Sequence, residues 1–402
     1  MQETSTSPAT ILQFRQDIEA QFRRHIREAL DTALAEELAA ALGSEPHQRT
    51  ERRRGYRNGS VERTITTTPE GTRRVTVPRG RITGADGRTT EFHSQLLPRY
   101  ARRTREIDEA ILSCYLGGVN SRRIRTALKP LLGERHLSKS AVSRIVGRLK
   151  ALFATWQGRD LSAERYPIVF LDGFHLKVRV ARRVVSVPVL AALGVTETGQ
   201  KCLLTLRVAA SEASATWGAA VTDLQQRGLV APLLLIVDGN AGLKHALKQW
   251  EDVRVQRCTT HKLENLRTHC PKHAQAEMKR DYHRLLYAAD GLAARAAYEA
   301  FVKKWSTLCP AVAKSLEEAG LELLTFYDFP KAMWKSLRTT NTVENLNREF
   351  RRRTKTQASF GTEDAALTVL YGLVAFGHVQ LRKVDGHQQL ASFLAKEWQK
   401  VA

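Results

Sequence analysis

The sequence predicts a mixed α/β domain that is interrupted by a long helical segment and preceded by a mainly helical, basic region with a small β element. Three observations support this fold class. Apolar runs of strand length alternate with helical patterns in residues 161–258. Residues 259–335 carry helical patterns and little strand signal. Residues 47–105 combine turn residues with short alternating stretches.

The first expected element is helical and lies within residues 1–46. Apolar side chains recur at helical spacing from residue 9 to residue 42, and the pattern ends near Gly43 and Pro46. We expect one helix or a helix pair. Its apolar stripe would pack against the same chain or against a second copy of it.

The second segment, residues 47–105, is basic and is expected to form short strands. Alternating stretches at 61–68 and 73–77 predict these strands, the second of which ends at Pro78. Arginines at the start of the segment are candidates for DNA contact: Arg52, Arg53, Arg54 and Arg57. Runs of like charge also occur simply as solvated surface, which is the alternative here.

The third segment, residues 106–160, is expected to hold helices at 107–116 and 121–128 and a third that begins near 137. The third helix has a serine-rich start and basic exposed positions, which is typical of the recognition helix of a helix-turn-helix. An ordinary three-helix packing unit is the alternative. The candidate DNA contacts are Ser138, Lys139, Ser140, Ser143 and Arg144.

The central segment, residues 161–258, is expected to form a mixed sheet. Hairpin-length links join the early strand candidates, whereas helical stretches separate the later ones. The strand candidates are 168–171, 176–180, 184–195, 202–209, 233–237 and 253–258, with helices at 213–227 and 243–250. An all-helical insertion, 259–335, and final helices with a tail, 336–402, complete the chain.

Three acidic residues occupy special places in this pattern. Asp172 and Asp238 each close an apolar run, and Glu344 lies in the first turn of a predicted helix. Carboxylates on strand ends and a facing helix can share two hard divalent cations, which would drive in-line attack on a phosphodiester. Two alternatives stay open. Each aspartate precedes a glycine, as turn residues do, and Glu344 fits a capping box with Asn341.

Composition favours a polyanionic partner. The 402 residues include 63 Lys and Arg against 41 Asp and Glu, a net charge of +22, which points to nucleic acid. No apolar run approaches the roughly 20 residues that span a bilayer, and the N-terminus lacks a signal core. We therefore expect a cytoplasmic protein without a membrane partner. Five scattered cysteines argue against a disulfide framework.

Two Cys-x2-His pairs follow the last strand candidate: Cys258 with His261, and Cys270 with His273. Together they could form a zinc site, but the helical pattern between them makes convergence awkward. We expect Cys258 and His261 to lie beside the carboxylates instead, as auxiliary groups of the site.

Basic residues continue the predicted helix of Glu344, and they suit phosphate binding. These residues are Arg351, Arg352, Arg353 and Lys355. The alternative is a solvated helix end. Trp217 is most simply a core residue, although a stacking role against an unpaired base is the other possibility.

Several of these motifs, in this order and spacing, make the chain resemble the Mutator-type bacterial insertion-sequence transposases from about residue 10 to residue 385. The motifs are Arg54-Gly-Tyr-Arg-Asn-Gly59, Leu171-Asp-Gly-Phe-His-Leu-Lys-Val-Arg179, Trp217 with Arg227-Gly-Leu229, Val237-Asp-Gly239 with Gly242-Leu243, Arg257-Cys-Thr-Thr-His261, and Arg338-Thr-Thr-Asn-Thr-Val-Glu344.

The resemblance implies a ribonuclease-H-like catalytic domain with an Asp-Asp-Glu triad, interrupted by an all-helical insertion. It places the triad on Asp172, Asp238 and Glu344, with two Mg2+ or Mn2+ ions per active site and no small-molecule cofactor. It implies double-stranded DNA as partner, both terminal inverted repeats and target DNA. It further implies a homodimer that performs strand transfer and is associated with the bacterial nucleoid. The Cys-x2-His element, matched by Cys258 and His261, is also a feature of the family.

The leading hypothesis is thus a DNA transposase, and two other classes stay open. One is a DNA-binding regulator on an old nuclease scaffold, whose mark would be the loss of a triad carboxylate. The other is a ribonuclease-H-like nuclease that hydrolyses but never joins strands.

Overall fold

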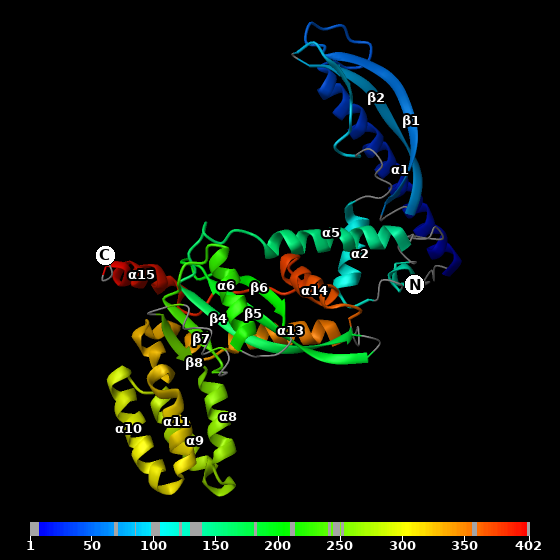
Figure 1. Ribbon diagram of the computed structural model, residues 1–402. Helices are drawn as coiled ribbons and strands as arrows, with labels where there is room; N and C mark the ends of the chain where they lie inside the picture. Colours follow the sequence, from blue (N-terminus) through cyan, green and yellow to red (C-terminus); the bar gives the residue numbers. More distant parts are fainter. Residues whose placement is uncertain are drawn as a thin grey trace, which may run out of the picture. The chain divides into compact units, whose positions relative to one another are not determined.

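The computed structural model describes residues 8–67, 71–84, 86–97, 105–119, 123–128, 139–180, 183–209, 214–239, 243, 250, 253–355 and 360–399 (Figure 1). It is a mixed α/β protein with two sheets, as the sequence predicts. The chain divides into two compact units: Met1–Tyr115 with Val119–Val146, and Leu116–Gly118 with Gly147–Ala402. No helix in the described ranges combines the length and hydrophobicity that a membrane crossing requires.

The N-terminal unit is built on one long helix and a long β-hairpin. Its elements are α1 (Pro8–Leu42), β1 (Gly55–Thr67), β2 (Gly71–Thr83), β3 (Thr89–Glu91), α2 (Arg105–Leu116) and α3 (Ile124–Ala127). The strands are antiparallel in the order β1-β2-β3. Leu34 of α1 packs with Ile65, Val75 and Val77 of the hairpin. Of the two alternatives, one helix or a helix pair, the structure has the single helix α1. The C-terminal part of its apolar stripe packs within the chain.

The hairpin strands are longer than expected because Pro78 does not end β2. Pro78 pairs with Ser60, beside a register shift between Arg57 and Ser60. A bulge interrupts the ladder there, so the missing N–H of proline is tolerated. The strand then continues to Thr83.

Helix α5 (Lys139–Gln157) corresponds to the predicted third helix of the 106–160 segment. The predicted helix at 121–128 is represented by the four residues of α3, while Ser138 lies outside the described residues. Ala141, Val142, Ile145 and Leu149 are buried along one side of α5. The helix-turn-helix interpretation stays a prediction.

The second unit contains a mixed five-stranded sheet in the order β6-β5-β4-β7-β8. Its strands are β4 (Ile168–Val180), β5 (Arg183–Val195), β6 (Lys201–Val208), β7 (Leu234–Val237) and β8 (Arg254–Arg257). Strands β4, β5 and β6 are antiparallel, whereas β7 pairs in parallel with both β4 and β8. Helix α6 (Ser214–Gln226) crosses from β6 to β7, and its Trp217 lies in the core. The predicted helix at 243–250 falls largely outside the described residues.

One strand differs from expectation at the candidate site. The separate strands predicted at 168–171 and 176–180 are a single strand, β4, that runs straight through Asp172 and Gly173. Asp172 pairs with Ala191 of β5 and Gly173 pairs with Leu190. The turn interpretation of this Asp-Gly pair is wrong, because continuous antiparallel pairing holds both residues extended.

The expected helical insertion lies between β8 and α13. It consists of α8 (Thr259–His269), α9 (Gln275–Leu286), α10 (Gly291–Leu308), α11 (Pro310–Ala319) and α12 (Trp334–Leu337), with 3-10 turns at Lys272–Ala274, Gly320–Leu323, Thr325–Asp328 and Lys331–Met333. Figure 1 shows α8 to α11 as a bundle of neighbouring helices. Buried Arg257 and Lys262 both contact Glu318 of α11, which ties this bundle to the end of β8.

The chain then returns to the sheet through its last helices. These are α13 (Asn341–Thr354), α14 (Glu363–Ala375) and α15 (Leu390–Gln399), the last preceded by a 3-10 turn at His387–Gln389. Helix α13 packs against β4, where Phe350 and Phe174 have ring centroids 5.8 Å apart. This contact sets which face of α13 meets the strand that carries Asp172.

Candidate active site

The parallel register of two strands brings the two predicted aspartates together. Leu171 of β4 pairs with Val237 of β7, so Asp172 and Asp238, the next residues along, are neighbours on strands about 4.8 Å apart. Asp172 is buried, and its Oδ1 accepts a hydrogen bond from the Gly173 amide at 3.0 Å. Asp238 directly follows β7 and is partly exposed.

Gly239 explains why the chain can leave the sheet directly after Asp238. Its φ of +92° is in the left-handed region, and an added Cβ would lie 2.0 Å from Nη2 of Arg257. Only glycine fits that backbone conformation and that close approach. The buried Arg257 thus supports the turn that begins at Asp238.

Helix α13 supplies the third carboxylate. Asn347 of this helix donates from Nδ2 to Oδ2 of Asp172 at 2.7 Å. Glu344 precedes Asn347 by three residues, so both lie on one face of the helix. The sequence prediction missed Asn347, which is buried on the same side of α13 as Leu346 and Phe350.

The helix start differs from the predicted capping box. Thr340 is the N-cap, and the Asn341 amide donates to Thr339 Oγ1 rather than to Glu344. Glu344 Oε1 accepts from the Thr340 hydroxyl at 2.7 Å. The capping-box interpretation is therefore wrong, since the helix begins one residue early and the Glu344 carboxylate is held by a side chain.

The electrostatics of Asp172 show that acidic groups cluster here. The pKa of its carboxyl is raised from the ordinary 3.8 to about 7, chiefly by burial and then by the negative charges of Asp238 and Glu344, while His261 opposes the rise. Each carboxylate therefore disfavours the ionised form of Asp172. A site that gathers acidic groups in this way is adapted to positive charge.

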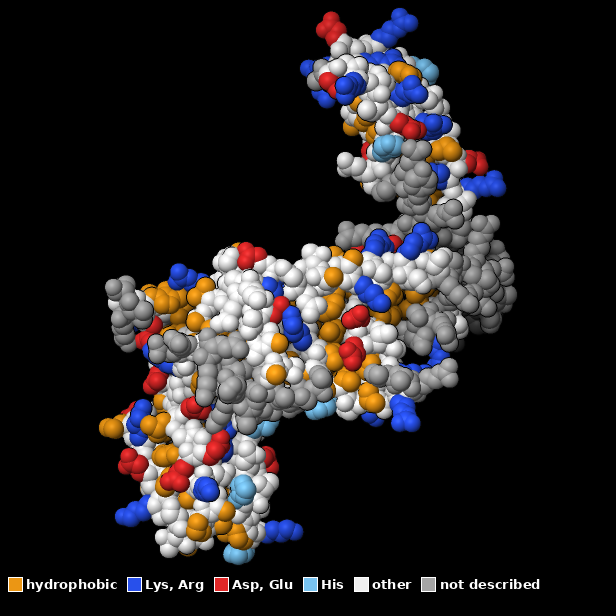
Figure 2. Space-filling model, viewed as in Figure 1, with side chains coloured by type: hydrophobic (Ala, Val, Ile, Leu, Met, Phe, Trp, Pro, Cys, Tyr) orange, Lys and Arg blue, Asp and Glu red, His pale blue; other side chains and the backbone are white. Residues whose placement is uncertain are grey.

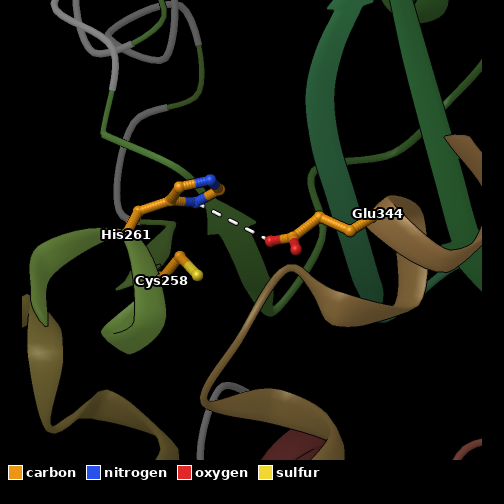
Figure 3. A group of neighbouring side chains, drawn as sticks. All are labelled: Cys258, His261 and Glu344. Carbon is orange, nitrogen blue, oxygen red and sulfur yellow. Dashed lines mark ion pairs between the residues drawn. The ribbon is translucent and has the colours of Figure 1, made fainter. Parts of the chain in front are cut away.

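Cys258 and His261 lie beside Glu344 (Figure 3). Cys258 is the buried residue that precedes α8, and His261 is in the first turn of that helix. His261 Nδ1 is 3.8 Å from Glu344 Oε1 and 3.4 Å from Thr340 Oγ1. The Thr340 amide donates to Cys258 Sγ at 3.4 Å. Thr340 is the second residue that the sequence prediction missed.

The charges of this pair depend on each other. The pKa of His261 is raised to about 9, chiefly by the hydrogen bond with Cys258 and also by the negative charges of Cys258, Glu344 and Asp238, against the effect of burial. Burial opposes ionisation of the Cys258 thiol, but the hydrogen bond and the charge of His261 lower its pKa. A protonated His261 thus adds a positive charge to the edge of the carboxylate cluster.

The four-ligand zinc alternative does not fit the geometry. Cys258 and His261 are at the start of α8, whereas Cys270 and His273 follow its end. Eight helical residues, 262–269, lie between His261 and Cys270 and hold the two pairs about 12 Å apart along the helix. Among the described residues, the donor group around His261 contains Cys258 and Glu344 and neither member of the second pair.

Comparison with known proteins gives the family. Residues 1–383 match the family described as "Transposase, Mutator family". This chain belongs to that family. The resemblance seen in the sequence motifs is thereby confirmed.

Curated relatives of this Mutator-family chain are insertion-sequence transposases. It is 34% identical over 371 residues to the transposase for IS905 of Lactococcus lactis, covering 91% of each chain. It is 34% identical over 357 residues to the transposase for IS406 of Burkholderia multivorans, covering 87% of this chain and 88% of the other. It is 31% identical over 332 residues to the transposase for IS256 in Tn4001 of Staphylococcus aureus, covering 81% and 82%.

The basic residues after Glu344 lie at the other end of α13 in this Mutator-family chain. Arg351 and Lys355 are exposed. Arg352 pairs with Glu349 at 2.6 Å, and Arg353 donates to the His378 carbonyl at 3.2 Å. The structure does not bring them to the carboxylates, since several residues of helix intervene.

The N-terminal candidates for DNA contact belong mainly to the first unit. Arg52, Arg53 and Arg54 precede β1 and are exposed, while Arg57 is half-buried and donates to the Ser44 carbonyl at 3.3 Å. Exposed positions on the first turns of α5 are Ser140, Ser143 and Arg144. The side chain of Lys139 lies outside the described set. Figure 2 shows Lys and Arg side chains spread over the surface rather than gathered in one patch of this face.

Proposed function

We propose that this protein is a DNA transposase that binds the terminal inverted repeats of an insertion sequence and catalyses metal-dependent strand cleavage and strand transfer. The observation that carries the proposal is the convergence of Asp172, Asp238 and Glu344, from β4, from the end of β7 and from α13. Family membership and the net charge of +22 support DNA as the substrate.

The mixed sheet supports a ribonuclease-H-like assignment for the catalytic core. Three antiparallel strands are followed by two parallel ones, and the acidic residues lie on adjacent strands and a later helix. Within this proposal, residues 161–258 and 336–402 form the core and 259–335 the insertion. Residues 47–105 and 106–160 bind the element's ends, and 1–46 contributes to a homodimer.

The residues of the site fit two Mg2+ or Mn2+ ions. Carboxylate oxygens are the ligands that these hard cations prefer. Asp172, Asp238 and Glu344 would hold them, and Asn347 Oδ1, one of the buried atoms without a partner in the described part of the chain, is a further oxygen beside Asp172. Bound ions would supply charge stabilisation for the attacking and the leaving oxygen of an in-line displacement.

Other groups of the chain orient these ligands. Asn347 fixes one oxygen of Asp172, and Thr340 fixes one oxygen of Glu344. His261, with its raised pKa, carries a positive charge at the edge of the cluster that would attract a DNA phosphate. Cys258 maintains that charge through its hydrogen bond to His261.

The assay that tests this proposal uses labelled DNA bearing the element's ends. We expect the wild-type protein to nick this DNA with Mg2+, and we expect Asp172→Asn to lower the nicking rate at least about a hundredfold while end binding is kept. Normal nicking by the variant would exclude Asp172 from the chemistry. Pre-cleaved ends then separate the hydrolytic nuclease from the transposase, because only the transposase yields joined product.

A further inference from the structure

A pocket lies at the starts of α8 and α13, within the second unit. It has a volume of about 450 Å³, in the range of small-molecule sites. The wall residues that matter most here are Lys201, His283, Tyr287, Lys335, Arg338 and Asp385. We call it the α8–α13 pocket, after the two helices that begin at it.

Cations outnumber acids in the α8–α13 pocket. Lys201, Lys335 and Arg338 contribute positive charges, against the single carboxylate of Asp385, whose Oδ2 is 3.9 Å from Lys335 Nζ. Burial, together with the charges of Lys279 and Arg338, lowers the pKa of His283. His283 is therefore neutral near pH 7, and its ring can both donate and accept hydrogen bonds. The pocket thus suits an anionic ligand that also carries polar edges.

An aromatic platform lies on one side of the pocket. Tyr287 is 62% exposed, which is unusual for a large aromatic side chain, and Arg338 Cζ lies 4.5 Å from its ring centroid. Leu263 and Leu286 add apolar surface. Aromatic faces and guanidinium planes are the surfaces on which unpaired bases stack. The pocket therefore combines phosphate-binding charge with a site for a base.

The pocket and the carboxylates share the same two helix starts. Thr259 and Thr260 lie between Cys258 and His261 along the chain, and Asn345 directly follows Glu344. The pocket therefore adjoins Cys258, His261 and Glu344 along the chain.

We propose that the α8–α13 pocket binds one unpaired nucleotide of the DNA strand that leaves the carboxylates, with the base against Tyr287 and Arg338 and the phosphate near Lys201 and Lys335. This inference rests on the proposed function, because it assumes that DNA lies at the carboxylates. The proposed pocket adds a requirement that strand cleavage alone does not impose, because the DNA next to the carboxylates must then be unpaired.

The test uses the full-length protein and two DNA probes in EDTA, where no strand is cut. One probe is a duplex with a four-nucleotide single-stranded tail that carries 2-aminopurine, prepared with either tail polarity; the other is the fully paired duplex. We expect the wild-type protein to quench the tail fluorescence for one polarity. Tyr287→Ala should abolish this quenching and weaken binding of the tailed probe about tenfold, with binding of the paired probe unchanged.

Matched variants separate stacking from general binding. Tyr287→Phe keeps the ring and should keep the quenching, whereas Arg338→Lys keeps the charge without the plane and should reduce it. Leu292→Ala, at an 81% exposed position of the same insertion, should change neither signal.

Two results would overturn the inference. One is that Tyr287→Ala quenches the tail fluorescence as the wild type does. The other is that Tyr287→Ala weakens binding of the tailed and the paired probe equally, which would mean that Tyr287 contributes to general DNA binding and not to stacking on an unpaired base. Because the assay contains no divalent ion, its outcome is independent of strand cleavage. Asp172→Asn should quench normally, so a protein that fails to cut can still support or refute the pocket.

Discussion

At the scale of single residues, Asp172 is a carboxyl whose ionised form the fold strongly disfavours. It is buried, it has Asp238 and Glu344 as like-charged neighbours, and its pKa is about 7. In an unfolded chain the same carboxyl ionises near 3.8. Such an arrangement lowers the stability of the metal-free protein at neutral and high pH. Bound cations would offset this cost by stabilising the ionised carboxylates.

The pH dependence of stability follows from this difference. A carboxyl whose folded pKa is raised contributes most below pH 3.8, and its contribution is lost as the pH rises through about 7. This difference in pKa lowers the free energy of unfolding at high pH by on the order of 4 kcal/mol relative to its value at low pH. We expect Asp172→Asn to raise the thermal midpoint of the metal-free protein at pH 8, and to raise it much less near pH 4.5.

Asparagine suits this position because Asn347 can reverse its amide, so that its Oδ1 accepts a hydrogen bond from the new side chain. Thermal unfolding in EDTA measures the effect, and added Mg2+ should raise the midpoint of the wild type only. A midpoint gain that is the same at both pH values would show that Asp172 is not held at a raised pKa.

Asn347 gives a second prediction. Its Nδ2 holds Asp172 Oδ2 at 2.7 Å, so Asn347→Ala should leave Asp172 poorly oriented. We expect the cleavage rate to fall about 10- to 100-fold, the range typical of groups that orient metal ligands. End binding should not change. Arg348→Ala, the adjacent exposed position on α13, is the matched control and should cleave normally. Equal rates for both variants would remove Asn347 from the site.

At the scale of elements, α13 has two chemically distinct ends. Glu344 and Asn347 meet the sheet near its start, and its last turn is basic. Arg351 and Lys355 are exposed there, while Arg352 already pairs with Glu349. If the basic end binds DNA phosphates, the exposed Arg351 and Lys355 should contribute more to the binding affinity than Arg352, whose charge is already paired with Glu349.

We therefore expect the double change of Arg351 and Lys355 to alanine to weaken DNA binding and to reduce the salt slope by about two, one for each phosphate contact. Arg352→Ala should have the smaller effect. Binding isotherms at several salt concentrations measure both quantities. An unchanged slope in the double variant would mean that this helix end is only solvated surface.

The elements also show what the sequence could predict. Hairpin spacing among the early strands and the crossover helix before β7 were enough to predict a mixed sheet, and the apolar runs located Asp172 and Asp238. The Asp172-Gly173 pair was misinterpreted because turn propensity is local, while continuous pairing with β5 is a tertiary effect. The start of α13 was misplaced by one residue because Thr340 and Asn341 are both plausible caps.

Other features could not be predicted from the sequence at all. Asn347 reaches Asp172 only because α13 packs on β4. Thr340 contacts both Cys258 and Glu344 only because α8 and α13 begin side by side. The α8–α13 pocket needs Lys201 from β6 and Arg338 from after α12 to meet. Such groupings depend on how distant segments pack, which periodicity and composition do not encode.

At the scale of the whole molecule, the fold joins residues from three distant parts of the chain. The parallel pairing of β4 and β7 brings the aspartates together, and the helical insertion returns the chain so that α13 can add Glu344. The same convergence produces a second donor group, Cys258, His261 and Glu344. The account therefore depends on where a hard cation binds.

Anomalous diffraction from crystals of the full-length protein soaked in Mn2+ tests this most directly. We predict two peaks, which lie between Asp172, Asp238 and Glu344 within coordination distance of their carboxylate oxygens. A single peak between Cys258 and His261, with none beside Asp172 and Asp238, would contradict the account.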